Sequence, residues 1–342
     1  MPKSKGELNI LIGEKRDLFS IDLAEVGHLF LTGWVRSGKE QVVRTILTSL
    51  AFNYDPSEVR FIVYDDEADF EDLTLINPFA LTPIIHDEVV YMRALRWTIN
   101  ELQERHKQFI AAGVSTIEEY NSQGKEKVGK VVGRKLPGMI EEKKPHIVFI
   151  IKTIDSLSHE HKSMINELVN KGSKAGIHLI LVSHSIFKHS LSAASLSNLP
   201  NKIVCPITND EEGLELGIPE AKYLKEKEMF VLYHGEKPIK INRIDVSKED
   251  VGKIQEYIKL KYVEIHYSGA LVGTPKPDAN MDSLFTQALQ IVIESGKAST
   301  SFIQRRLKVG YSRAAALIEM MEEQGYVGPA KGSGEPRELL KK

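Results

Sequence analysis

The feature that most restricts the fold of this chain is a glycine–lysine loop near its amino terminus. Gly33-Trp34-Val35-Arg36-Ser37-Gly38-Lys39-Glu40 lies between an apolar run, Leu29–Thr32, and a segment with helical spacing, Glu40–Phe52. Glycines at this spacing let backbone N–H groups curl round a phosphate, while the lysine and the positive end of the following helix attract it. The spacing therefore predicts a Walker A loop, in which Gly33, Gly38 and Lys39 bind a nucleotide phosphate. A simple turn is the alternative, but the strand before and the helix after favour the loop.

Short apolar runs alternate with helical segments over the first 260 residues. The runs are rich in Ile, Val, Leu and Phe without polar alternation, which is typical of strands buried on both faces of a sheet. This order predicts a doubly wound α/β fold with a mostly parallel sheet. The predicted strands are Leu8–Ile12, Leu29–Thr32, Arg60–Tyr64, Ile147–Ile151, His178–Val182 and Met229–Tyr233, and the predicted helices are Glu40–Phe52, Val89–Ile110 and His161–Lys174.

The 342 residues are enough for two domains, since a domain usually takes roughly 100–200 residues. Two prolines and two glycines in the stretch 267–280 predict a linker. We therefore expect an α/β domain over residues 1–266 and a small module over 281–342. Within the first domain, the basic, glycine-containing stretch Gln123–His146 is interpreted as a solvated loop. Contact with a phosphate backbone is its alternative role.

Composition excludes several classes of protein. A single cysteine, Cys205, rules out an internal disulfide and a cysteine-rich zinc site, and it fits a reducing compartment. The eleven histidines form no spacing typical of a metal site. No apolar run approaches the ~20 residues of a membrane helix, so we expect a cytoplasmic protein without a membrane segment. A net charge of −2 excludes a wholly basic surface but not a local basic patch.

The residue after the loop lysine departs from the pattern of a working phosphate site. A Walker A loop has Ser or Thr there, whose hydroxyl holds Mg²⁺, but this chain has Glu40. Two like unit charges about 4 Å apart at an effective dielectric constant of about 20 repel by roughly 4 kcal/mol. Glu40 therefore weakens nucleotide binding. Direct coordination of the metal by Glu40 is the less favoured alternative, because its side chain is longer than a hydroxyl group.

The end of a neighbouring strand lacks the acidic pair that hydrolysis requires. An Asp there organises Mg²⁺ and a Glu activates water. The apolar run Ile147–Ile151 is followed instead by Lys152 and Thr153, and Asp155 lies beyond them as a helix cap. The hydroxyl, the metal-organising Asp and the catalytic Glu are absent together, which predicts a site that does not hydrolyse nucleotide.

The last 60 residues have the order helix, helix, helix, hairpin. Phe285, Ala288, Ile291 and Val292 form an apolar stripe on the first helix, and the third helix, Ser312–Gln324, also has one. This order is typical of a winged helix-turn-helix, whose third helix enters the DNA major groove while the hairpin contacts the backbone. A module used only for protein contacts is the alternative. The basic residues expected to flank the DNA are Arg305, Arg306, Lys308, Arg313, Lys331 and Arg337.

These segments together resemble the FtsK/SpoIIIE family of double-stranded DNA translocases, over nearly the whole chain. The likeness begins at Gly27-His28-Leu29, before the loop, and includes Ala175-Gly176-Ile177-His178-Leu179. The most specific part looks like the family's γ domain, a winged helix that reads oriented chromosome motifs. It consists of Lys297-Ala298-Ser299, Gln304-Arg305-Arg306, Gly310-Tyr311-Ser312-Arg313-Ala314-Ala315 and Met321-Glu322-Glu323-Gln324-Gly325.

The resemblance implies a RecA-like fold, a hexameric ring and ATP with Mg²⁺ as cofactors. It implies double-stranded DNA as the partner, contacted by Gln304, Arg305, Arg306, Ser312, Arg313, Lys331 and Arg337. The departures from the family are concentrated at the motor site. The family's acids fall at Lys152 and Thr153, and its Asp-Pro-Lys signature falls at Asp65-Asp66-Glu67, where a charge is reversed. In the module, the family's Asn falls at Ser312, whereas Arg313 is kept.

Three hypotheses follow from the sequence. The first is a DNA-binding family member, linked to chromosome segregation and cell division, whose degenerate motor acts as a scaffold, a regulator or a subunit of a mixed ring. The second is an active translocase that uses Glu40 and Asp155 as replacement acids. The third is a protein-interaction scaffold. We favour the first, and expect Arg313→Ala to weaken sequence preference and Lys331→Ala to weaken binding to all sequences alike.

Overall fold

The computed structural model describes residues 8–123, 143–152, 154, 158–185, 199–233, 235–262, 268, 271 and 279–307, and single positions among 314–339. The chain divides into two compact units, Met1–Val272 and Gly273–Lys342. Most of the predicted linker, 267–280, and most of the basic stretch Gln123–His146 lie outside the described residues.

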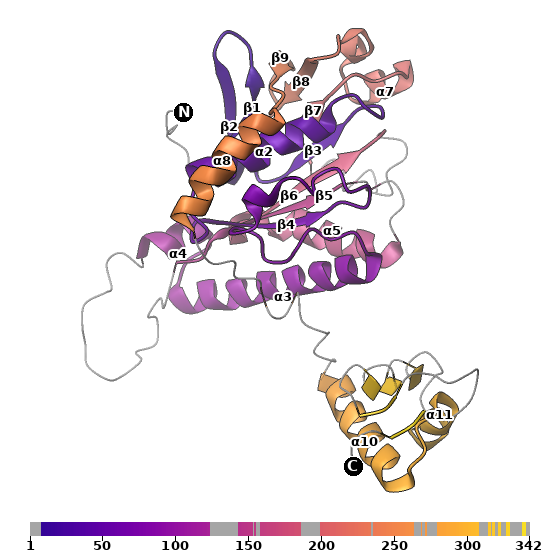
Figure 1. Ribbon diagram of the computed structural model, residues 1–342. Helices are drawn as coiled ribbons and strands as arrows, with labels where there is room; N and C mark the ends of the chain where they lie inside the picture. Colours follow the sequence, from indigo (N-terminus) through magenta and orange to yellow (C-terminus); the bar gives the residue numbers. More distant parts are fainter. Residues whose placement is uncertain are drawn as a thin grey trace. The chain divides into compact units, whose positions relative to one another are not determined.

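A nine-stranded mixed sheet organises the first unit, in the order β2-β1-β9-β8-β7-β3-β6-β5-β4 (Figure 1). The half from β7 to β4 is parallel, whereas the half from β2 to β8 is antiparallel and joins it through the β7–β8 pair. The bounds are β1 Asn9–Glu14, β2 Leu18–Asp22, β3 Leu29–Thr32, β4 Val59–Tyr64, β5 His146–Ile151, β6 Ile177–Ser183, β7 Lys202–Val204, β8 Glu228–Leu232 and β9 Ile239–Arg243.

The six predicted strands correspond to β1, β3, β4, β5, β6 and β8. The α/β fold with several parallel strands is confirmed. The structure adds three strands without a strong sequence signal: β2 and β9 in the antiparallel half, and β7, which pairs parallel with β3 and antiparallel with β8. β7 is short, and β9 alternates apolar Ile239 and Ile241 with polar Lys240 and Asn242. Strands with one solvated face lack the continuous apolar run that marks the central strands.

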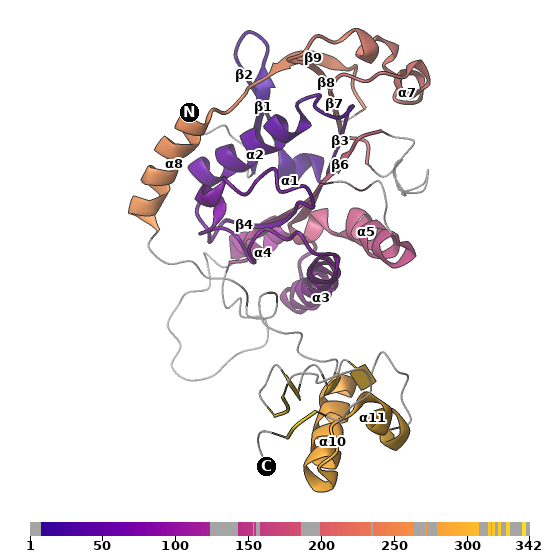
Figure 2. The same cartoon turned by 45° about the vertical axis from the view of Figure 1, so that its right-hand side comes forward.

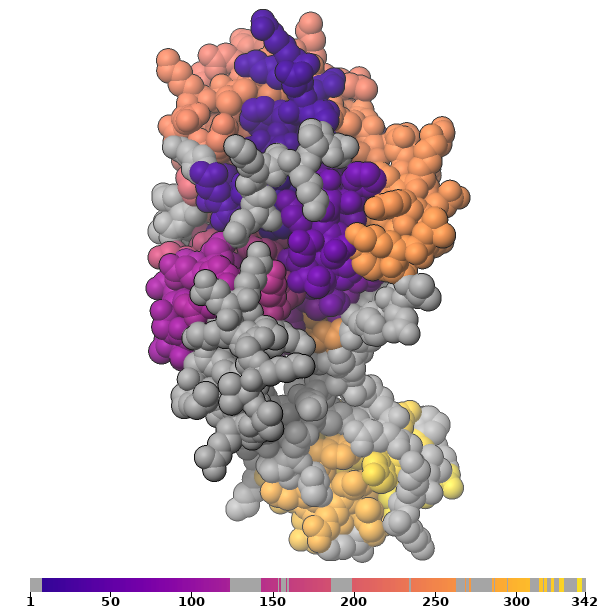
Figure 3. Space-filling view, turned by 90° about the vertical axis from the view of Figure 1, so that its left-hand side faces the viewer, coloured from indigo at the N-terminus to yellow at the C-terminus, as the bar shows by residue number. Residues whose placement is uncertain are grey.

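Helices cover both faces of the sheet (Figures 1 and 2). Successive residues of the central strands point to opposite faces, so Val148 and Ile150 of β5 pack with α2 and α8, whereas Ile147, Phe149 and Ile151 pack with α3 and α5. Figure 3 shows α8, in orange, beside α2, in purple. The bounds are α1 Leu23–Val26, α2 Lys39–Asn53, η1 Thr74–Ile76, α3 Glu88–Ala112, α4 Ile117–Gln123, α5 His159–Lys171, η2 Ser173–Ala175, α7 Asp210–Glu215, η3 Pro219–Tyr223 and α8 Lys248–Lys261.

Local capping determines where the long helices begin. Asp87 accepts hydrogen bonds from the backbone N–H groups of Val89 and Val90 at the start of α3, and Ser247 accepts one from Asp250 N at the start of α8. These contacts satisfy amide groups that have no partner inside the helix. Among the described residues, no helix is both long and apolar enough to cross a membrane.

The second unit contains α10, Ala279–Ser295, and α11, Thr300–Leu307. The apolar stripe of the first helix faces the core of this unit: Ala288 and Val292 are buried with Ile303, Leu317 and Ile318, whereas Phe285 and Ile291 are partly buried. Two antiparallel bridges, Ala298–Arg337 and Val327–Leu339, bring the end of the chain back to these helices. The hairpin tip predicted around Lys331 lies outside the described residues.

Candidate functional site: the glycine–lysine loop and the ends of the neighbouring strands

The glycine–lysine loop joins the carboxyl end of β3 to the start of α2. Gly38 precedes α2 with a φ of 93°, and Gly33 has a φ of 154°. A side chain at Gly33 would lie 2.7 Å from Ser37 Oγ and 2.8 Å from Cys205 Cβ. Both glycines are therefore needed for the backbone path, because an L side chain would be strained there. Arg36 adopts a φ of 64° without being glycine.

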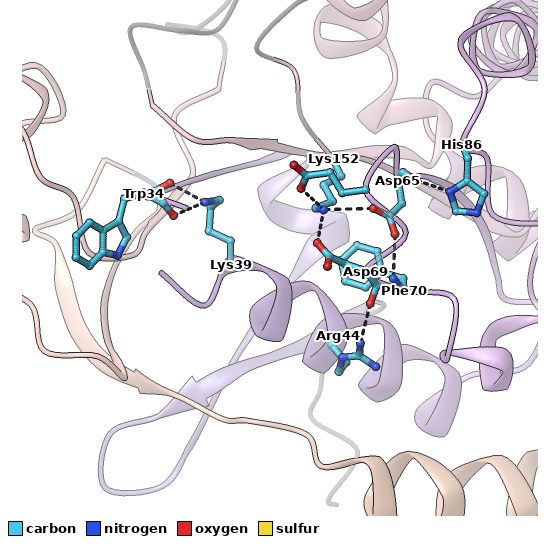
Figure 4. A network of polar contacts seen from close by, with 10 residues as sticks. Trp34, Lys39, Arg44, Asp65, Asp69, Phe70, His86 and Lys152 are labelled. Carbon is cyan, nitrogen blue, oxygen red and sulfur yellow. Dashed lines mark hydrogen bonds and ion pairs between the residues drawn. The ribbon is translucent and has the colours of Figure 1, made fainter. Parts of the chain in front are cut away.

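The loop lysine is bonded to the loop itself. Lys39 is 1% exposed, and its Nζ donates to the carbonyl oxygens of Gly33, at 2.6 Å, and Trp34, at 2.7 Å (Figure 4). The indole of Trp34 points away from Lys39 and is about half exposed. In this arrangement the ammonium group of Lys39 binds two backbone carbonyl groups of the loop.

Glu40 lies in the first turn of α2. A carboxylate there interacts favourably with the positive end of the helix, which explains why the fold tolerates it. The groups that influence the pKa of the buried thiol of Cys205 show which charges lie near the loop. Burial raises the pKa of Cys205 to about 12, the charges of Lys39 and Arg243 oppose that rise, and the charge of Glu40 adds to it. Two cations and one carboxylate thus lie within electrostatic reach of Cys205.

An ion cluster with a buried lysine at its centre lies at the ends of the adjacent parallel strands β4 and β5. Lys152 follows β5 and is 2% exposed. Its Nζ lies 3.3 Å from Asp65 Oδ1 and 2.5 Å from Glu67 Oε2, and it also contacts the carboxylate of Asp69 (Figure 4). The three carboxylates come from the segment after β4, which runs beside β5 because Tyr64 pairs with Ile151.

Lys152 keeps its charge in this cluster. Burial alone would lower the pKa of its ammonium group, but hydrogen bonds to Asp69 and Glu67 and the charge of Asp65 more than offset burial and raise the pKa above its usual value. A buried ammonium group is stable only when it is paired in this way.

The carboxylate-bearing segment is itself held in place. Asp65 is fully buried, and its Oδ2 accepts a hydrogen bond of 2.9 Å from Phe70 N. Arg44 of α2 binds Asp72 at 2.9 Å and donates to the backbone oxygen of Asp69 at 2.8 Å (Figure 4 shows the second contact). The segment is therefore tied to the helix that follows the glycine–lysine loop.

The residues around the loop do not fit Mg²⁺. The position for a metal-holding hydroxyl carries Glu40, and the carboxylates of the segment after β4 surround the ammonium group of Lys152. Among the residues that the structure describes, no group of three or more His, Cys, Asp or Glu side chains is arranged to hold a metal ion. Thr153 and Asp155 lie outside the described residues.

The predicted DNA-contacting residues fall into three groups. Gln304, Arg305 and Arg306 lie on α11, where Arg305 Nε donates to Ser301 O at 3.2 Å and Arg306 lies 5.7 Å from the ring centre of Phe302. Arg337 forms an ion pair with Glu322 inside the module. Ser312, Arg313 and Lys331 lie outside the described residues.

Two contacts of the site were not predicted from the sequence. The pairing of Lys152 with Glu67 could have been found, because both positions depart from the family with exchanged charges. The contact of Arg243 with the loop, described below, has no local signal, since more than 200 residues separate them.

Segments in both units match known protein families. Residues 2–188 match the FtsK/SpoIIIE family, and residues 279–342 match the FtsK gamma domain. The DNA translocase FtsK of Clostridium tetani is 29% identical over 93% of this chain and 43% of its own length. The DNA translocase SftA of Bacillus subtilis is also 29% identical, over 94% of this chain and 33% of its own length. The chain thus spans less than half the length of these relatives.

Solved structures share the fold of the first unit. EssC (ATPases 2 and 3) from Geobacillus thermodenitrificans has a TM-score of 0.63 at 19% identity, over 81% of this chain and 53% of its own. The pCW3 conjugation coupling protein TcpA, solved with ATPγS, has a TM-score of 0.61 at 16% identity, over 76% and 72%. These likenesses confirm the P-loop ATPase fold. Because the family match covers more than half of its residues, the chain belongs to the FtsK/SpoIIIE family.

Proposed function

We propose that this chain is a DNA-binding member of the FtsK/SpoIIIE family, linked to chromosome segregation and cell division, whose motor domain has lost ATP hydrolysis. Its partner is double-stranded DNA, and it assembles with copies of itself or in a mixed ring with an active paralogue. It acts on DNA as a passive subunit, a scaffold or a regulator.

The observation that carries the proposal is the ion pair between Lys152 and Glu67, at 2.5 Å. The resemblance places an acid of the family at position 152 and a lysine at position 67, so the charges at these two positions are exchanged in this chain, and here the two side chains form an ion pair. An exchange of this kind preserves the stability of the site. The exchange removes the carboxylate that organises Mg²⁺. Without that carboxylate no metal ion is held in place to polarise the phosphate for hydrolysis.

Replacement acids do not restore the missing chemistry. Asp65, Glu67 and Asp69 all contact the ammonium group of Lys152, so this fixed cation lies at the centre of the cluster where a divalent ion would have to bind. Glu40 lies in the first turn of α2 next to Lys39, where a carboxylate repels a phosphate. These contacts support an inactive motor rather than an active translocase with substituted residues.

The match to the gamma domain and the cations of α11 support DNA binding. We expect binding to weaken with salt, because each neutralised phosphate releases a counterion and contributes about −0.9 to the slope of log K against log salt. Arg305→Ala and Arg306→Ala should each remove about one phosphate contact and so make this slope shallower by about 0.9. Fluorescence anisotropy with a labelled duplex measures both effects. Lys253→Ala, an exposed cation of α8 paired with Glu249, is the matched control.

The same assay tests the motor. A hydrolysing translocase moves off the end of a short duplex, so ATP with Mg²⁺ would speed its dissociation. We expect the dissociation half-time of this chain to be unchanged by ATP and Mg²⁺. Faster dissociation with ATP than with ATPγS would contradict the proposal, and binding that is independent of salt would contradict the DNA interface.

A further inference from the structure

An arginine from a distant part of the chain packs against the glycine–lysine loop. Arg243 ends β9, and its side chain is 9% exposed. One guanidinium nitrogen donates to Ser37 O, at 3.3 Å, and also to the backbone oxygen of Glu226. Its Nε donates to Asp245 Oδ1 at 2.7 Å. The guanidinium group therefore bridges the loop and the segments on either side of the β8–β9 pair.

The position of this group is unusual for a cation. A Cβ atom at Gly38 would collide with the guanidinium of Arg243, so the guanidinium lies directly over the residue that precedes α2. The start of a helix carries a positive partial charge and favours anions. A cation is retained here because Asp245 and two backbone carbonyls accept its hydrogen bonds.

Side-chain cations hold this loop from two directions. Lys39 binds the carbonyls of Gly33 and Trp34, and Arg243 binds the carbonyl of Ser37. A loop that cradles phosphate offers inward N–H groups to an anion. Three carbonyl groups of this loop are instead bound to ammonium or guanidinium groups, which stabilises the form without an anion.

We propose that Arg243 is a positioning residue that holds the loop closed and excludes nucleoside triphosphates. This rests on the proposed function and deepens it, because it assigns the exclusion of nucleotide to Arg243, in addition to the repulsion by Glu40, and the loss of hydrolysis to Lys152. Removing the Arg243 side chain frees the space over Gly38 and releases the carbonyl of Ser37. The loop then becomes able to bind the phosphates of ATP.

Trp34 supplies a reporter inside the loop. The chain has two tryptophans, so Trp97→Phe leaves Trp34, about half exposed, as the source of tryptophan fluorescence. In this background, ATP and ATPγS are titrated with and without Mg²⁺ into the parent and into Arg243→Ala. We expect at least about tenfold tighter apparent binding for Arg243→Ala, since the apparent dissociation constant scales inversely with the fraction of loops that are open.

Two further variants make the result decisive. Lys240→Ala removes an exposed cation of the same strand, paired with Glu228 at 2.9 Å, and should leave the titration as in the parent. Asp245→Asn weakens the carboxylate that orients Arg243 and should give a smaller gain, which provides the test if Arg243→Ala does not fold. Equal affinity of the parent and of every folded variant at Arg243 and Asp245 would overturn the inference. Hydrolysis by the parent would instead overturn the proposed function, so the two failures are distinguishable.

Discussion

Replacing Lys152 with alanine is expected to lower the free energy of unfolding of the first unit by about 3–5 kcal/mol, because it leaves a buried carboxylate without its cation. Asp65 is fully buried and Glu67 and Asp69 are partly exposed, and all three contact the same ammonium group. Water screens the two exposed carboxylates, so most of the loss comes from Asp65. Urea denaturation followed by circular dichroism measures the change.

A matched control and a charge exchange complete this test. Lys171→Ala removes an exposed lysine paired with Glu167 on α5, and such a pair contributes about 0.3–0.5 kcal/mol. Lys152→Asp alone should be at least as destabilising as Lys152→Ala, and adding Glu67→Lys should recover part of the loss. A loss below about 1 kcal/mol for Lys152→Ala, within the range of exposed pairs, would contradict the buried-cluster account.

Acid is expected to destabilise the first unit well above the pH at which carboxylates protonate. Three buried histidines cluster at the amino ends of the parallel strands. His178 Nδ1 donates to Gly27 O at 2.8 Å, and His146 Nδ1 donates to His178 Nε2 at 2.9 Å. His28 Nδ1 accepts from Leu179 N at 3.0 Å. These contacts use neutral rings.

Burial, with the charge of His178, lowers the pKa of His28 from 6.5 to about 3. Burial also lowers the pKa of His178 to about 4 and the pKa of His146 below its usual value. The unfolded chain therefore binds protons below pH 6.5 that the folded chain does not bind until lower pH. The stabilising contribution is complete above pH 6.5 and is lost as the pH falls toward 4.

Each such histidine contributes a slope of up to about 1.4 kcal/mol per pH unit in this window. Urea denaturation at pH 7, 6 and 5 measures the slope. His178→Gln should make the slope shallower than in the parent, because it removes one of the histidines whose pKa is lowered. Equal slopes for the parent and His178→Gln would contradict this explanation.

Local pattern was sufficient to predict the elements that carry the loop. The run Leu29–Thr32 coincides with β3, and the helix predicted from Glu40 begins at Lys39. These elements could be predicted because continuous burial leaves a continuous apolar run. β2 and β9 lie in the antiparallel half of the sheet and alternate buried with more exposed residues, so the same signal is absent.

The chemistry of the site could be predicted less well than its fold. The sequence showed that Lys152 and Glu67 depart from the family, but only the pairing of β4 with β5 shows that the two side chains meet. Arg243 reaches the loop through the β8–β9 pair, a contact between distant segments that no local pattern reports. The ion pair of Arg337 with Glu322 likewise joins segments that no local pattern connects, and the DNA contact expected of Arg337 stays a prediction.

The central claim is that Lys152 stands where the family has the carboxylate that organises Mg²⁺, so that the site no longer supports hydrolysis. Turnover of ATP by the purified chain, measured by phosphate release with saturating duplex DNA and Mg²⁺, tests it most directly. The account predicts a rate no higher than that of the same solution without protein, at every DNA concentration. Hydrolysis that rises with duplex DNA and disappears when Mg²⁺ is chelated would contradict it.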